Sequence, residues 1–200
     1  MPLKIASVLG ILVALACLGA ATSFYPGGFD WNRDFVSTLL RGPVGPARTL
    51  ADVGVVLFCV SLTFVFSRLA KYPEFAKNSK VINIGGIGSM VYASLTITPM
   101  HDLMVTISLV FLVVALVALM RALYANRETC FFIAGCVCFV VLVLSAAVYY
   151  ASLFVIVLPW AQRVSFGMLT AWLVALDFAL PRTSDVASRG GRRGSSSETE

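Results

Sequence analysis

Long apolar runs separated by short polar segments dominate this chain of 200 residues. A helix needs about 20 mostly apolar residues to cross a bilayer. Six runs approach that length, at residues 5–24, 51–69, 81–98, 103–120, 129–153 and 164–180. The last two are separated only by a short stretch with Pro159, Gln162 and Arg163, which fits two helices and a turn better than one long helix. The pattern predicts an all-α integral membrane bundle of six transmembrane helices.

Composition supports a membrane location and excludes a basic nucleic-acid-binding domain. The chain is 59% hydrophobic and 12% charged, whereas soluble domains carry about 25% charged residues. The surplus apolar side chains must therefore face lipid. The net charge of +5 is spread among the apolar runs and the C-terminal segment. We expect membrane lipids as partners, and no nucleic acid.

The first apolar run has two interpretations. Lys4 precedes it, and Ala20 and Ala21 near its end are small enough to come before a cleavage site, as in a secretory signal. The run is longer than the ~7–15 apolar residues of a usual signal. We therefore expect an uncleaved transmembrane helix.

Lysine and arginine positions indicate the orientation of the helices. If the N-terminus is cytoplasmic, only Arg33, Arg41, Arg48 and Arg163 fall in outer connections, and the other lysines and arginines lie inside. Positive residues favour cytoplasmic loops, so both termini are expected in the cytoplasm, with residues 1–180 forming the membrane domain of a multi-pass plasma-membrane protein. The basic and polar remainder, 181–200, is rich in Gly and Ser and is expected to be a disordered tail.

The first outer connection holds a dense polar and aromatic cluster, SFYPGGFDWNRDFVSTLL, at residues 23–40. Its YPGG segment predicts a turn after the first helix. Asp30 stands where a helix N-cap is expected, and Trp31, Phe35 and Leu39 recur at four-residue spacing. The stretch predicts a short amphipathic helix at the membrane interface. Its charges are either solvated or part of a binding site.

The second outer connection, TPMHD at residues 98–102, contains the only histidine. In one interpretation Asp102 caps the next helix and His101 is exposed in a tight turn. In the other, the outer connections meet in one pocket, where His101 acts as an acid or base near neutral pH and Asp34 or Asp102 orients it. The catalytic candidates are thus His101, Asp34 and Asp102. The binding candidates are the polar residues of the outer connections: Asp30, Arg33, Asp34, Ser37, His101, Asp102 and Arg163.

The sequence predicts neither a metal nor a cofactor. All five cysteines fall inside apolar runs without a CxxC spacing, which is typical of small buried hydrophobic residues. A zinc site uses several His or Cys ligands, and this chain has one histidine. The acidic residue of the sixth run, Asp177, could pair with Arg182.

Small residues mark one face of the third run. Gly85, Ser89 and Ala93 follow each other at four-residue spacing, a pattern that lets two helices approach closely. If that face points outward, it could serve a helix-mediated oligomer or another membrane partner.

The combination of motifs resembles a family. Tyr25, Pro26, Gly27, Asp30, Arg33, Asp34, Ser37 and Leu39, with Pro99, His101 and Asp102, match its outer stretch and its P-x-H-D turn. The chain, over residues 5–180, resembles an uncharacterised prokaryotic six-helix membrane family, catalogued as domain of unknown function nine hundred and ninety-eight. The resemblance implies the fold and topology, and it implies no activity.

Three hypotheses of function follow. The first is a membrane protein that binds a lipid head group or a small polar ligand at its outer face. The second is a membrane-embedded hydrolase or transferase of lipids with His101 as acid or base, which requires Asp34 within a few ångströms. The third is a scaffold or partner subunit that uses the small-residue face of the third helix.

Overall fold

The computed structural model describes residues 2–151 and 157–180. Within these residues it is all-α. The elements, in chain order, are α1 (Pro2–Ser23), α2 (Val36–Arg41), α3 (Pro46–Leu69), the 3₁₀ helix η1 (Pro73–Asn78), α4 (Ser79–Ser94), the 3₁₀ helix η2 (Leu95–Ile97), α5 (His101–Ala125), α6 (Thr129–Tyr150) and α7 (Leu158–Ala179). The predicted tail, 181–200, lies outside the described residues.

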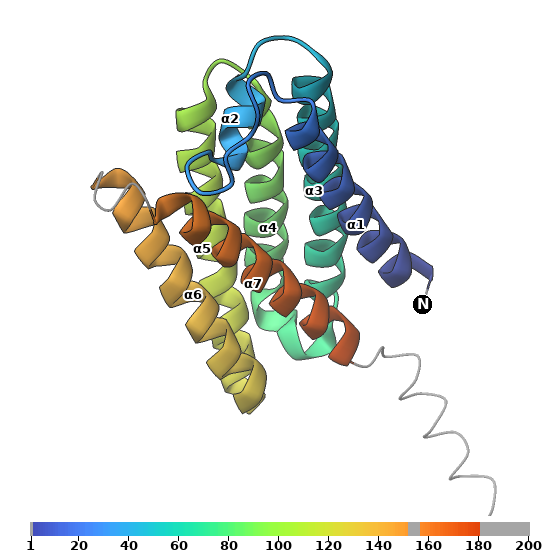
Figure 1. Ribbon diagram of the computed structural model, residues 1–200. Helices are drawn as coiled ribbons and strands as arrows, with labels where there is room; N and C mark the ends of the chain where they lie inside the picture. Colours follow the sequence, from blue (N-terminus) through green and yellow to red (C-terminus); the bar gives the residue numbers. More distant parts are fainter. Residues whose placement is uncertain (1, 152–156, 181–200) are drawn as a thin grey trace, which may run out of the picture.

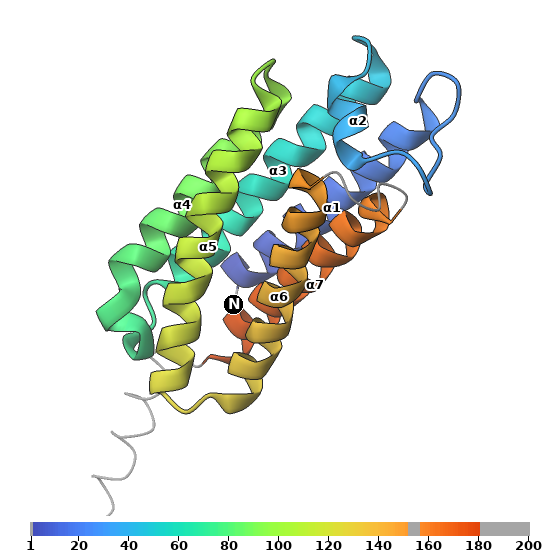
Figure 2. The ribbon, with the colours of Figure 1, turned by 90° about the vertical axis from the view of Figure 1, so that its left-hand side faces the viewer.

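The long helices form one bundle with two distinct ends. Helices α1, α3, α4 and α5 pack in succession, and the α6–α7 hairpin joins them through α5 and through contacts of α7 with α1 and α3. Figure 1 shows α7 running obliquely across the bundle, and Figure 2 shows α4 and α5 side by side. We call the end that carries α2 the α2 end, and the end that carries η1 the η1 end.

Among the described residues, five helical segments are long and apolar enough to span a membrane: Leu3–Ser23, Pro46–Leu69, Pro73–Ile97, His101–Ala125 and Thr129–Tyr150. The third of them consists of η1, α4 and η2 in succession. Large hydrophobic side chains such as Leu12, Ile84 and Leu144 are exposed on their outward faces, where lipid would cover them. The chain is therefore a multi-pass membrane protein of helical type. The sixth predicted span is observed as the helix α7, but Gln162, Arg163 and Asp177 make it less apolar than the other five.

Small residues bring neighbouring helices together inside the bundle. A Cβ added to Gly54 of α3 would lie 3.0 Å from the carbonyl oxygen of Ala14 in α1, and one added to Gly85 of α4 would lie 3.1 Å from Cβ of Ala115 in α5. Ser89, one turn beyond Gly85, is fully buried. The small-residue face of the third predicted helix thus packs against α5 of the same chain. The scaffold hypothesis loses the observation that motivated it.

The interfacial helix differs from its prediction. It begins at Val36, with Phe35 at the N-cap position, so the expectation that Asp30 caps it is wrong. Instead the Asp30 carboxylate accepts a hydrogen bond from the backbone N–H of Asn32 at 2.9 Å, and its own N–H donates to the Asp34 carboxylate at 2.8 Å. These two carboxylates bind backbone N–H groups that a helix would otherwise use. Residues 30–34 therefore form a loop before α2 begins.

Candidate functional site

Arg163 joins α7 to the loop that follows α1. Its guanidinium donates hydrogen bonds to the backbone carbonyl of Trp31 and, at 2.6 Å, to that of Asp34. Three aromatic rings surround it: the guanidinium carbon lies 5.0 Å from the ring centre of Trp31, 5.4 Å from that of Trp160 and 5.9 Å from that of Phe29. Contacts of this kind between Arg and aromatic faces are favourable within about 6 Å. Arg163 therefore fixes the first connection at the α2 end to the start of the last helix.

A second contact links the same loop region to α5 and α6. Arg41, at the end of α2, forms an ion pair with Asp102 in the first turn of α5. The Tyr149 hydroxyl of α6 donates to the same carboxylate at 3.2 Å. Beside it, the hydroxyls of Thr106 and Tyr150 lie 2.8 Å apart. The Arg41 and Asp102 side chains are 50% and 67% exposed, so this group of charges and hydroxyls is open to a ligand from outside the bundle.

Asp102 was expected to cap α5, and that prediction is wrong. The helix begins at His101, and its N-cap is Met100, two residues before Asp102. The carboxylate of Asp102 is turned toward Arg41 and Tyr149 instead of toward the first backbone N–H groups of α5. An acidic group in the first turn remains favourable because the N-terminal end of a helix is partly positive.

His101 is buried, contrary to the expectation of an exposed turn residue. Only 8% of it is exposed, and its Nδ1 lies 2.7 Å from the carbonyl oxygen of Thr96 in η2. The Asp34 carboxylate accepts from Asp30. Among the described residues, no hydrogen bond or ion pair joins Asp34 to His101. The acid–base hypothesis therefore lacks the contact between Asp34 and His101 that it requires. His101 instead connects the start of α5 to η2.

The remaining predicted residues lie at the α2 end. Arg33 is 87% exposed at its side chain, 3.8 Å from Asp30, and Ser37 is half-buried in α2. Within the described part of the chain, no cluster of three or more His, Cys, Asp or Glu is arranged to hold a metal ion.

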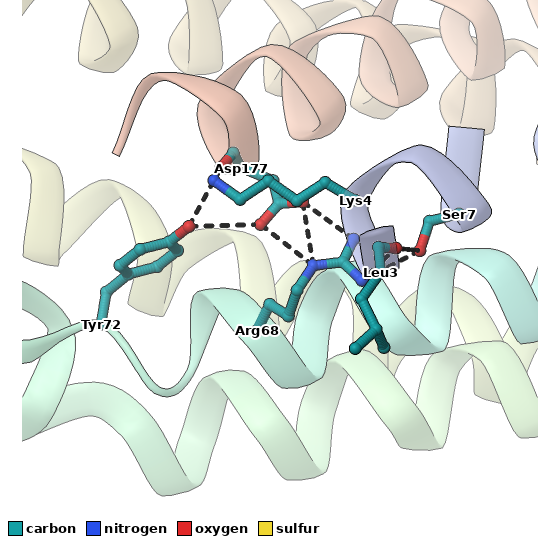
Figure 3. A network of polar contacts seen from close by, with 6 residues as sticks. All are labelled: Leu3, Lys4, Ser7, Arg68, Tyr72 and Asp177. Atoms are coloured by element: carbon teal, nitrogen blue, oxygen red, sulfur yellow. Dashed lines mark hydrogen bonds and ion pairs between the residues drawn. The ribbon is translucent and has the colours of Figure 1, made fainter. Parts of the chain in front are cut away.

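A buried ionic cluster lies at the opposite, η1 end (Figure 3). Asp177 of α7 is 1% exposed. The Arg68 guanidinium of α3 donates to its carboxylate through Nε, at 3.0 Å and 3.2 Å, and through a terminal nitrogen at 2.8 Å. The Tyr72 hydroxyl lies 3.4 Å from the carboxylate and donates at 3.0 Å to the Asp177 carbonyl oxygen, which also accepts from Lys4 of α1. The cluster connects α1, α3 and α7.

Arg68 also holds the first turn of α1. Its other terminal nitrogen donates to the Leu3 carbonyl at 3.1 Å and to the Ser7 hydroxyl at 2.9 Å. A bidentate arginine–carboxylate pair satisfies both partners, which is what makes a buried charge tolerable. The first turn of α1 is therefore joined to the buried ionic cluster through Arg68.

Sequence analysis missed this cluster. Arg182, the expected partner of Asp177, lies outside the described residues, and the carboxylate binds Arg68. One signal was present: the distribution of lysines and arginines had placed Lys4 and Arg68 on the inner side, together with Arg182, the expected partner of Asp177. An ion pair between Arg68 and Asp177 was thus compatible with the predicted topology. No spacing rule could predict it, because the two residues are 109 positions apart.

Comparison of the chain with family models, with curated proteins and with solved structures gave no match. The resemblance to the uncharacterised six-helix family therefore stays a prediction.

Proposed function

We propose that this chain is a six-span protein of the cytoplasmic membrane, with both termini inside, that binds a phospholipid head group at its outer face. The observation that carries the proposal is the exposed group at the α2 end formed by Arg41, Asp102 and Tyr149. It lies at the same end of the bundle as the Trp31 and Trp160 rings that contact Arg163, and this mixture of aromatic and charged side chains is typical of a membrane interface.

The chemistry of this group suits a zwitterionic head group. Arginine binds phosphate through two parallel hydrogen bonds, and a carboxylate pairs with a lipid ammonium group. Arg41 and Asp102 now pair with each other, but an ion pair this exposed contributes only about 0–1 kcal/mol. Exchanging it for contacts with phosphate and amine therefore costs little. The hydroxyl of Tyr149 adds a neutral donor close to the carboxylate.

The six-span topology is supported by the distribution of basic residues and by the α6–α7 hairpin. Helix α7 has 22 residues, enough for about 33 Å at 1.5 Å per residue, which matches a hydrocarbon core of about 30 Å. Its buried Asp177 is paired with Arg68, so the carboxylate does not face lipid. The distribution of basic residues favours an orientation with the α2 end outside and the η1 end in the cytoplasm.

Native mass spectrometry of the protein in mild detergent tests the head-group proposal. The probes are phosphatidylethanolamine and a diacylglycerol with the same acyl chains. We expect the wild type to retain the phospholipid better, and Arg41→Gln and Asp102→Asn each to weaken its binding roughly tenfold, because each removes one charge-assisted contact.

Arg48→Gln is the matched control for charge, since Arg48 is a partly exposed arginine of the same end that pairs with Asp52. It should leave phosphatidylethanolamine binding unchanged. Equal retention of the two lipids by the wild type, or an equal loss in Arg41→Gln and Arg48→Gln, would refute head-group recognition by this group.

A further inference from the structure

An open groove runs between α4 and α5 on the outside of the bundle, near the η1 end. Its volume is about 280 Å³, and its walls are the side chains of Val81, Ile84, Val110 and Val114. These residues are exposed on two helices that are apolar enough to span a membrane. The groove is thus apolar surface that a bilayer would fill with lipid chains.

The packing of one phenylalanine explains why the groove exists. The Phe111 ring stacks on Tyr92 with ring centres 5.5 Å apart. It also covers Gly88, where an added Cβ would lie 2.7 Å from the ring. Because Tyr92 and Gly88 are nearer the α2 end, the ring is drawn toward that end. On the other side of Phe111, Gly85 is buried at the floor of the groove, where its missing side chain lets the backbones of α4 and α5 approach closely.

The charged residue at the mouth of the groove indicates its occupant. Lys80, in the first turn of α4, is exposed and lines the groove at its η1 end. On α5, Arg121 comes seven residues after Val114, so it lies nearly on the same helix face, and it too is exposed. An apolar groove that opens onto cationic side chains complements an amphiphile with an apolar chain and a negative head.

We propose that this groove binds one acyl chain of an anionic phospholipid, whose phosphate lies at Lys80. Lysine binds phosphate as a point charge, and a groove of this size holds part of one chain. In the six-span topology proposed above, the lipid belongs to the cytoplasmic leaflet, where anionic lipids and basic side chains attract each other. The site is separate from the Arg41–Asp102 group at the α2 end, and it does not depend on lipid binding there.

The test uses the full chain, stripped of lipid in mild detergent and titrated with phosphatidylglycerol or phosphatidylcholine of identical chains. Native mass spectrometry measures how many lipids are retained. We expect the wild type to prefer phosphatidylglycerol and Lys80→Gln to weaken that binding roughly fivefold, as expected for one basic residue near a lipid phosphate. Lys77→Gln, which removes an exposed lysine of η1, should not change it.

A second variant tests the groove itself. Val114→Phe adds volume at an exposed position, keeps every charge, and should lower the retention of both lipids. Far-UV circular dichroism checks that the variant is folded. Wild-type retention by Val114→Phe would overturn the proposal, as would equal losses in Lys80→Gln and Lys77→Gln. Conversion of a dimer to a monomer by Val114→Phe would also overturn it, since a second copy would then occupy the groove.

The two lipid sites remain distinguishable. Lys80→Gln should leave phosphatidylethanolamine retention at the wild-type level, and Arg41→Gln should leave the preference for phosphatidylglycerol over phosphatidylcholine intact.

Discussion

Asp177→Leu should destabilise the protein by about 3–5 kcal/mol, the usual result of removing one partner from a buried ion pair. Asp177 is 1% exposed, and its carboxylate accepts hydrogen bonds from two nitrogens of Arg68 at 2.8–3.2 Å. Hydrogen bonds to charged groups contribute about 1.5–3 kcal/mol each. After the substitution Arg68, whose side chain is 13% exposed, keeps its charge in an apolar setting without the carboxylate. The contacts of Tyr72 and Lys4 with the Asp177 backbone carbonyl should survive.

Unfolding in mixed micelles with increasing sodium dodecyl sulfate, followed by circular dichroism, gives the free-energy difference. Trp172 offers a second signal, since its ring packs on Gly135 and its Nε1 donates to the Phe131 carbonyl at 3.0 Å. Asp102→Asn is the matched control, an exposed carboxylate that also pairs with an arginine. It should cost no more than about 1 kcal/mol.

The double variant Arg68→Leu/Asp177→Leu completes the cycle. Removing both charges should cost less than the sum of the two single substitutions, because neither partner is then left buried and unpaired. An Asp177→Leu protein within about 1 kcal/mol of the wild type, or a double variant as unstable as that sum, would contradict this account of the cluster.

Three further predictions concern other parts of the fold. Arg163→Leu should speed trypsin cleavage after Arg33 roughly tenfold, because loss of the contacts with the Trp31 and Asp34 carbonyls and with the aromatic rings lets the loop open more often. Limited proteolysis measures the cleavage rate. An unchanged rate would show that other contacts hold the loop. Gly86→Ala should lower the free energy of unfolding by about 1–3 kcal/mol, since its Cβ would lie 2.3 Å from Cγ of Phe66. Gly167→Ala, whose Cβ would have nothing within 4 Å, should be neutral or stabilising in the same detergent unfolding assay. A fluorescent protein fused after Glu200 should fluoresce while alkaline phosphatase fused there stays inactive; the opposite pair of results would contradict the six-span topology.

The positions of the long helices could be predicted from the sequence because apolar runs of membrane length leave few alternatives. The ends of α2 and α5 were less predictable. Asp30 and Asp102 both look like helix caps, yet each carboxylate has a different partner from the one that a cap would give it. For Asp30 that partner is a backbone N–H of its own loop, and for Asp102 it is Arg41. Local rules describe which partners a residue can have, and tertiary contacts decide among them.

The candidate site could be predicted only as a region. The sequence had placed the polar connections at one end, and the contacts of Arg163 and Arg41 do join them there. The partners of Arg163 could not be inferred, because they are backbone carbonyls, which every residue offers. His101 was expected at the surface on the strength of its turn sequence. Its burial depends on the Thr96 carbonyl, which is freed by the change from α4 to the 3₁₀ turn η2.

The buried cluster also sets an order for the assembly of the protein. During synthesis, Lys4 and Arg68 enter the membrane with the first helices, and Asp177 follows only after the chain has grown by another 109 residues. Until then Arg68 has the Leu3 carbonyl and the Ser7 hydroxyl of α1 as partners, and lipid phosphates and water can satisfy the remaining donors near the surface that long basic side chains can reach. Arrival of the last helix supplies the carboxylate, draws the cations inward and joins the first helix to the final one. The helix that completes the bundle, α7, is thus synthesised last. A nascent chain without α7 exposes basic side chains that lack the Asp177 carboxylate.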